Sequence, residues 1–151
     1  MALAKLVRDR EGKVYAVDIW EEGLRFLRSK IKSGQNVQII CRSAEELELP
    51  RRSLDKIFCF DTLHELPHPE KAGRRWADLL KEDGRFYFKD PKISPEQVEQ
   101  LSNGRLGQAK SIRGITIFAP QIMKGKKRKG KKGGEAHDQA DLGCDAYREE
   151  P

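Results

Sequence analysis

The sequence predicts an α/β fold with a doubly wound, mostly parallel sheet. Short runs rich in β-branched and aromatic residues recur along the chain, at residues 13–17, 37–41, 56–60, 85–89 and 115–118. These runs are mostly apolar rather than alternating, which is typical of strands covered on both faces. Most of them are separated by patterns of helical spacing. This alternation predicts strand–helix–strand units with right-handed crossovers.

The first unit of this kind is predicted within residues 13–41. Its first strand ends at Asp18, and apolar residues then recur at spacings of four, three and four, as on one helix face: Trp20, Leu24, Leu27 and Ile31. Gly34 suits the C-terminal end of that helix. The run at 37–41 is the second strand, and the polar residues 43–53 predict a connecting loop.

The third strand is predicted at residues 56–60. Pro69 can open the next helix at its first position. We expect that helix to end at Gly84 and to bury one apolar stripe, formed by Ala72, Trp76, Leu79 and Leu80.

The remaining elements follow the fourth strand at 85–89. Ser94 and Gln97 have the spacing of a capping box, with Pro95 between them at the first helical position, so a short helix is expected there. A last short strand is predicted at 115–118.

Composition divides the chain near residue 120. We expect residues 1–120 to form the α/β domain, with a helix fragment at residues 1–10, and residues 121–151 to be a disordered tail. From Lys124 to Lys132 the tail has seven basic residues and no acid, and six acids follow from Glu135 onward. Such a basic run can contact RNA through its phosphates, although the lack of interleaved aromatics favours a solvated tail.

The cysteines indicate a reducing compartment. Cys41 and Cys59 lie in apolar runs, Cys144 lies in the tail, and no close pair suggests a metal or redox motif. The sequence has no apolar stretch of 18 residues and no signal peptide, so we expect a cytoplasmic protein.

Candidate binding residues follow the predicted strands. In open parallel sheets, ligands bind beyond the carboxyl ends of the strands, where the sequence places Asp18, Ser43, Ala44, Asp61, Thr62, His64 and Asp90. A carboxylate there can accept from two vicinal ribose hydroxyls. Asp18 could equally be the N-cap of the following helix, and the residues alone leave both readings open.

The segment from His64 to His68 fits the zinc-protease spacing His-Glu-x-x-His. That motif works only when both histidines lie on one helix face. Pro67 would break such a helix. We therefore expect a loop here and no metal site.

Four segments, taken together and in order, resemble the class I S-adenosylmethionine-dependent methyltransferases of the methyltransferase type 11 kind. They are Lys13–Ile19, Asn36–Pro50, Leu54–Leu66 and Leu79–Asp90. The resemblance spans roughly residues 1–118. It implies a Rossmann-like fold and methyl transfer from S-adenosylmethionine to a small-molecule acceptor.

The resemblance also implies roles for individual residues. Asp18, with Ile19, would hold the ribose, and Ser43 and Ala44 would border the adenine. Asp61 and Thr62 would lie near the methionine end. His64 is the sensible base, needed only if the acceptor must lose a proton.

The sequence departs from the family pattern at the beginning of the chain. In that family a strand and a glycine-rich loop precede the first helix, and residue 1 already falls inside the corresponding helix. We therefore expect a sheet without the usual first, central strand, in an N-terminally truncated chain. Asp141–Asp145 resembles the start of a glycine motif, but a permuted arrangement is disfavoured because no apolar strand precedes it.

A missing central strand would leave two open edges, and each buried unpaired backbone group costs about 1–3 kcal/mol. The neighbouring strands could close on each other, a homo-oligomer could cover the edge, or the natural protein could be longer. The alternative function is a non-catalytic methyltransferase-like binding module whose basic tail contacts RNA or another anionic partner.

Overall fold

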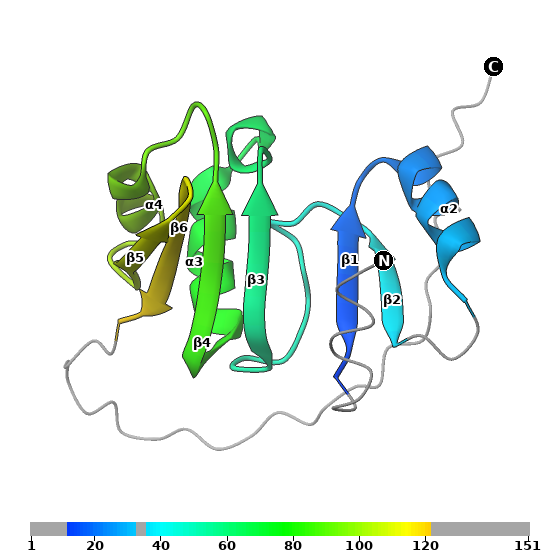
Figure 1. Cartoon of the computed structure of the whole chain (residues 1–151), viewed down its shortest axis with the longest axis horizontal. Helices are drawn as coiled ribbons and strands as arrows, with labels where there is room; N and C mark the ends of the chain where they lie inside the picture. The colour runs from blue at the N-terminus through cyan, green and yellow to red at the C-terminus, as the bar shows by residue number, and fades with distance from the viewer. Residues whose placement is uncertain (1–11, 33–35, 122–151) are drawn as a thin grey trace. The chain divides into compact units, whose positions relative to one another are not determined.

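The computed structural model describes residues 12–32 and 36–121, which form two compact units (Figure 1). One unit contains the described residues up to Ser43, and the other contains those from Ala44 onward. The helix fragment predicted at residues 1–10, the tail with its basic run Lys124–Lys132, and the segment Asp141–Asp145 all lie outside the described residues. None of the described helices is long and apolar enough to cross a membrane.

The first unit is a strand–helix–strand crossover. It consists of β1 (Val14–Asp18), α2 (Glu21–Lys30) and β2 (Val37–Cys41). The two strands pair in parallel, with Val14 opposite Val37 and Asp18 opposite Cys41. The predicted order of strand, helix and strand is confirmed, but the helix ends at Lys30, before Ile31, and the predicted helix end at Gly34 lies outside the described residues. Of the predicted helix face, Leu24 is buried, whereas Trp20 precedes the helix and is 63% exposed.

The second unit contains four strands, one 3-10 helix and two α-helices. In chain order they are β3 (Leu54–Phe60), η1 (Leu63–Glu65), α3 (Pro69–Leu79), β4 (Leu80–Lys89), α4 (Pro95–Leu101), β5 (Leu106–Ile112) and β6 (Ile115–Pro120). The strand order is β3-β4-β6-β5. Strands β3 and β4 are parallel, and β6 is antiparallel to both β4 and β5. The chain is therefore an α/β protein with a mixed sheet, as Figure 1 shows.

The core of the second unit is built from aromatic rings. Phe86 and Phe88 on β4 and Phe118 on β6 are almost completely buried, and Trp76 of α3 covers them. The ring centre of Phe86 lies 5.5 Å from that of Trp76 and 5.8 Å from those of Phe88 and Phe118. These distances are typical of favourable aromatic pairs. The alternation of buried and exposed residues along β4 thus directs one face of the sheet onto α3.

The two helices approach each other at a glycine. A Cβ on Gly73 of α3 would lie 3.1 Å from the backbone of Leu101 and Ser102 at the end of α4. The α4 helix itself begins as predicted, because Ser94 and Gln97 form a complete capping box. A side chain at residue 73 would force these helices apart, which explains the glycine in an otherwise regular helix.

The structure corrects the predicted end of α3. The helix ends at Leu79, and β4 begins at Leu80, so Gly84 lies inside a strand rather than at a helix terminus. The β3–β4 register shifts here, with Leu80 opposite Leu54 and Arg85 opposite Lys56. A Cβ on Gly84 would lie 2.9 Å from the carbonyl oxygen of Lys81. The glycine therefore permits a close backbone approach in an irregular strand.

Strand β5 was not predicted. It carries one buried side chain, Leu106, and otherwise consists of half-buried or exposed residues at the sheet edge. The signal for it is the turn that follows: Arg113 and Gly114 have φ values of 49° and 76°. Two consecutive positive φ values are what a two-residue hairpin turn requires. β6 extends two residues beyond the predicted strand, to Pro120.

Candidate functional site

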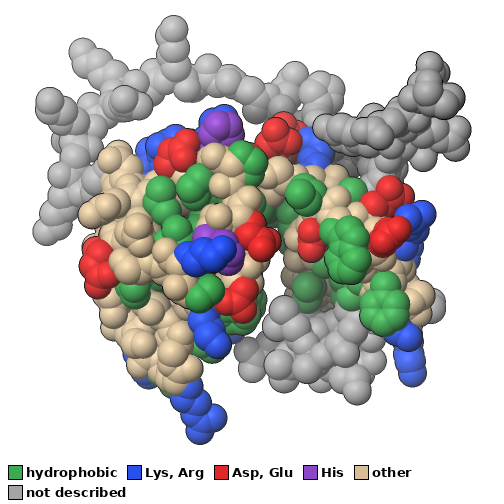
Figure 2. Space-filling view, turned by 90° about the horizontal axis from the view of Figure 1, so that it is seen from above, with side chains coloured by type: hydrophobic (Ala, Val, Ile, Leu, Met, Phe, Trp, Pro, Cys, Tyr) green, Lys and Arg blue, Asp and Glu red, His purple; other side chains and the backbone are tan. Residues whose placement is uncertain are grey.

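The candidate site of the second unit lies beyond the carboxyl ends of β3 and β4. Both strands point upward in Figure 1, and Figure 2 looks onto the end at which they finish. Histidine, acidic and basic side chains appear together on that face. The structure thereby brings together Asp61, Thr62, His64 and Asp90, which the sequence placed after two different strands.

Asp61 ends β3 in a backbone conformation that is rare for a non-glycine residue. Its φ is 51°, in the left-handed region, which aspartate tolerates better than most residues. Its N–H still donates to the carbonyl oxygen of Lys89 at 2.8 Å, and the Thr62 hydroxyl donates to the carbonyl oxygen of Phe60 at 2.8 Å. Conformations of this kind cluster at functional sites. They turn the chain sharply here and leave the Asp61 side chain exposed.

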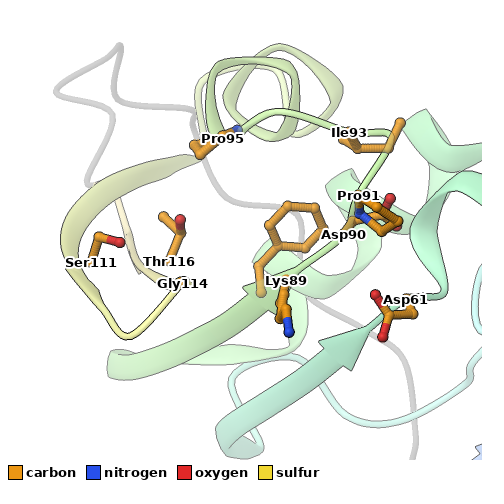
Figure 3. Close-up of a pocket in the computed structure, with 10 residues that line it drawn as sticks. Asp61, Lys89, Asp90, Pro91, Ile93, Pro95, Ser111, Gly114 and Thr116 are labelled. Carbon is orange, nitrogen blue, oxygen red and sulfur yellow. The ribbon is translucent and has the colours of Figure 1, made fainter.

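A pocket of about 330 Å³ opens beside these residues (Figure 3). Its floor is formed by the ends of β3 and β4, where Asp61, Lys89 and Asp90 lie. Ile93 and Pro95 contribute from the segment that leads into α4, and the β5–β6 hairpin closes the other side with Ser111, Gly114 and Thr116. The pocket thus combines apolar surface with acidic, basic and hydroxyl groups.

Next to this pocket, His64 is paired with Asp90. The ring atom Nδ1 of His64 lies 2.9 Å from each carboxylate oxygen of Asp90. The His64 side chain is 12% exposed, and that of Asp90 is fully buried. His64 lies in the 3-10 helix η1, whereas His68 lies outside it and immediately precedes α3.

The ionisation of Asp90 reflects these contacts. Burial alone would raise the pKa of its carboxyl group. Hydrogen bonds from the His64 side chain and from the backbone N–H groups of Lys92 and His64 outweigh burial, so the pKa lies below its ordinary value. Asp90 is therefore a carboxylate at neutral pH.

Cys59 lies close to Asp90, and its thiol is buried. Burial, with a smaller contribution from the charge of Asp90, raises the pKa of its thiol to about 12. A buried thiol with a raised pKa carries little thiolate at neutral pH, which disfavours a role as a nucleophile. Cys59 belongs to the core, which agrees with its place in an apolar run of the sequence.

In the first unit, Asp18 ends β1 with its side chain exposed. Its Oδ1 atom accepts a hydrogen bond from the N–H of Trp20 at 3.0 Å. The residue at the N-cap of α2 is Trp20, so Asp18 is not the cap. Its Oδ2 atom accepts from no donor among residues 12–32 and 36–121. The neighbouring Ile19 is 73% exposed, a large apolar side chain at the same strand end.

Ser43 and Ala44 follow β2, and both are half-buried. The carbonyl oxygen of Ala44 accepts a hydrogen bond from the indole N–H of Trp76 at 3.1 Å, and Ala44 packs against the core of the second unit. Ala44 is thus held in place by α3. Ser43 is the last described residue of the first unit.

Sequence reasoning missed part of the pocket lining. It did not identify Ser111 and Thr116 as site residues, because the strand that carries Ser111 was not predicted. It named Asp90 as a strand-end candidate but not its contact with His64, which is 26 residues away in the sequence. The turn at Arg113 and Gly114 is the sequence signal that could have revealed the strand carrying Ser111. No sequence signal reveals the contact between His64 and Asp90.

The chain matches known proteins in sequence pattern and in fold. A family model described as a methyltransferase domain matches residues 2–88. A SAM-dependent methyltransferase from Aquifex aeolicus is 25% identical, with a TM-score of 0.60 over 78% of this chain and 73% of that one. The PH0226 protein from Pyrococcus horikoshii is 22% identical, with a TM-score of 0.61 over 79% and 76%.

A further structural match contains a bound ligand. A Burkholderia thailandensis 1,6-didemethyltoxoflavin-N1-methyltransferase, solved with bound 1,6-didemethyltoxoflavin and S-adenosylhomocysteine, is 18% identical, with a TM-score of 0.57 over 73% of this chain and 62% of that one. At this level of identity the match shows the fold. No curated protein matches the chain in sequence.

Proposed function

Since this chain belongs to the methyltransferase domain family, we propose that it transfers a methyl group from S-adenosylmethionine to a small-molecule acceptor. The observation that best supports this function is the pocket of about 330 Å³ at the carboxyl ends of β3 and β4. Asp61 lines it, and Thr62 and His64 follow on the same segment. That is where parallel α/β sheets bind their ligands.

The residues of the first unit suit the adenosine part of such a cofactor. Asp18 uses one carboxylate oxygen to accept from Trp20, and a carboxylate has further lone pairs for ribose hydroxyls. Ile19 offers exposed apolar surface beside it. We assign Asp18 and Ile19 to the ribose, and Ser43 and Ala44 to the edge of the adenine.

The residues of the second unit suit the other part of the cofactor and the acceptor. The exposed carboxylate of Asp61 carries the charge that suits the amino group of a methionine moiety. Thr62 lies beside it, held by its hydrogen bond to Phe60. We assign both residues to the methionine end, and we assign His64 as the base for an acceptor that must lose a proton.

When bound, S-adenosylmethionine supplies an electrophilic methyl group, so the protein needs no nucleophile of its own. The side chains of this site therefore act by binding and orientation. Phe88, Ile93 and Pro95 add apolar surface to the pocket lining. We also propose a cytoplasmic location, because the thiol of Cys59 is free and buried, as is usual in a reducing compartment.

Calorimetric titration of the full chain tests this function. We expect binding of both S-adenosylmethionine and S-adenosylhomocysteine, because both carry the ribose and the amino-acid end. ATP is a matched control ligand, since it has the same adenosine but a triphosphate that the carboxylates of Asp18 and Asp61 repel. If a folded sample gives no heat with S-adenosylmethionine, or binds ATP equally well, the proposed function is wrong.

A further inference from the structure

Asp90 holds the His64 ring in one orientation. Besides the two 2.9 Å contacts to Nδ1, the Asp90 carboxylate accepts from the N–H of Lys92 at 2.9 Å and from the N–H of His64 itself at 3.2 Å. A buried carboxylate is costly unless it is paired in this way. The carboxylate is therefore fixed by backbone groups on two sides, and it fixes the ring in turn.

This contact determines which ring nitrogen carries the hydrogen. A carboxylate can only accept, so the neutral His64 ring donates from Nδ1. Its Nε2 atom then has a free lone pair. The side chain of Glu65 lies 3.8 Å from Nε2, beyond hydrogen-bond distance, and no described residue donates to that atom. The ring thus presents an unoccupied proton acceptor.

We propose that Asp90 is a positioning residue that keeps His64 in its Nδ1–H form, so that Nε2 removes a proton from the methyl acceptor. This inference rests on the proposed function. In that step the O–H or N–H bond of the acceptor breaks, its electron pair stays on the oxygen or nitrogen, and an Nε2–H bond forms. The carboxylate of Asp90 stabilises the resulting imidazolium. The proton passes to water after the product leaves.

A base at Nε2 of His64 favours one chemical class of acceptor. A hydroxyl or a ring N–H gains nucleophilicity when it loses its proton, so such a group benefits from a base. A carboxylate acceptor is already ionised and gains nothing. The pocket beside Asp90 mixes apolar surface with Lys89, Ser111 and Thr116, which suits a polar molecule with an apolar ring. We therefore expect a phenolic, alcoholic or heteroaromatic N–H acceptor rather than a carboxylic acid.

Nitrogen NMR of the ligand-free full chain tests the orientation directly. The chain has three histidines, and the spectra of His64→Gln and His68→Gln assign two of them. At a pH where the ring is neutral, we expect a protonated-type resonance for Nδ1 and an unprotonated-type resonance for Nε2 of His64. A histidine without a partner favours the opposite tautomer, so finding His64 in the Nε2–H form would overturn the proposal.

Asp90→Asn separates positioning from a purely structural role. The Asn amide can donate to Nδ1, so the variant should move His64 toward the Nε2–H tautomer. The matched control is Asp55→Asn, which removes an exposed aspartate that pairs with Lys81 and should leave the tautomer unchanged. A folded Asp90→Asn variant in which His64 keeps the wild-type tautomer would contradict the inference.

Methyl transfer provides the second readout. His64→Gln and Asp90→Asn should each lower kcat by about 10²–10⁴-fold. Because Asp90 acts through His64, the double variant should be no slower than His64→Gln alone. Additive losses would overturn the inference. Its failure differs from failure of the proposed function, since both variants should still bind S-adenosylmethionine by calorimetry.

Discussion

Replacing Phe86 with alanine should lower the free energy of unfolding by about 3–5 kcal/mol. Phe86 is completely buried at the centre of the second unit, and its ring contacts those of Trp76, Phe88 and Phe118. Its truncation leaves a cavity that neither β4 nor α3 can fill, since both are held by the surrounding sheet. Against a typical total stability of about 5–15 kcal/mol, this loss would bring the unit close to unfolding.

Urea unfolding followed by circular dichroism measures this effect, and Phe58→Ala is its matched control. Phe58 is also a strand aromatic, but it lies on β3 at the edge of the described four-stranded sheet and is 43% exposed. Its ring stacks on that of Tyr87, with 4.8 Å between the centroids. Because much of Phe58 already faces water, its truncation should cost less than about 1.5 kcal/mol. Equal losses in the two variants would mean that the aromatic cluster is not the core.

Asp18→Asn should weaken S-adenosylmethionine binding by about 10- to 100-fold, the equivalent of about 1.5–3 kcal/mol for hydrogen bonds to a charged group. The Asn side chain keeps an oxygen that can accept from the N–H of Trp20, so the local turn after β1 is preserved. The substitution removes the negative charge and one of the two carboxylate oxygens that could accept from the hydroxyls of a ribose. Calorimetric titration of the two proteins measures the difference.

The control for this variant is Glu21→Gln. Glu21 is an exposed acid three residues further along, in the first turn of α2, with a loose 3.9 Å ion pair to Arg25. The Glu21→Gln variant loses the same charge as Asp18→Asn, but at a surface position where a single ion pair contributes little stability. Its affinity for S-adenosylmethionine should equal that of the wild type. If both variants weaken binding alike, the effect comes from net charge, and Asp18 makes no specific contact.

Much of the fold could be predicted from the sequence because its strands are apolar and its helices carry clear terminal signals. The strand at Val37–Cys41 has the predicted bounds, and Pro69 and Ser94 begin α3 and α4 as expected. These signals are local. Each depends on residues within one or two turns of the element, so no tertiary information is required.

The differences arise where tertiary structure overrides local pattern. Gly84 resembles a helix terminus, yet it allows β4 to pass close to its own backbone within an irregular parallel pair. Strand β5 is polar because it lies at a sheet edge, so its sequence lacks the apolar period of the inner strands. This segment forms a strand because it pairs with β6 through backbone hydrogen bonds, and its own side chains give little signal of it.

The candidate site shows the same division. The acid at the end of each parallel strand is visible in the sequence, because Asp18 and Asp61 directly follow apolar runs. The pairing of His64 with Asp90 cannot be seen in the sequence, because it joins η1 to the end of β4 across 26 residues. A sequence pattern can thus indicate candidate binding positions at strand ends, whereas a contact between residues far apart in the sequence depends on the tertiary structure.

The central claim is that S-adenosylmethionine binds at the carboxyl ends of β1, β2 and β3. The most direct test is the ¹H–¹⁵N spectrum of the full chain during titration with S-adenosylhomocysteine, the demethylated form of the cofactor. We predict shifts at the amides of the strand ends, namely Asp18, Ile19, Ser43, Ala44, Asp61 and Thr62. Amides at the opposite ends of the strands, such as Val37 and Leu54, should not move. A folded protein whose spectrum is unchanged, or changes only at those opposite ends, would contradict the claim.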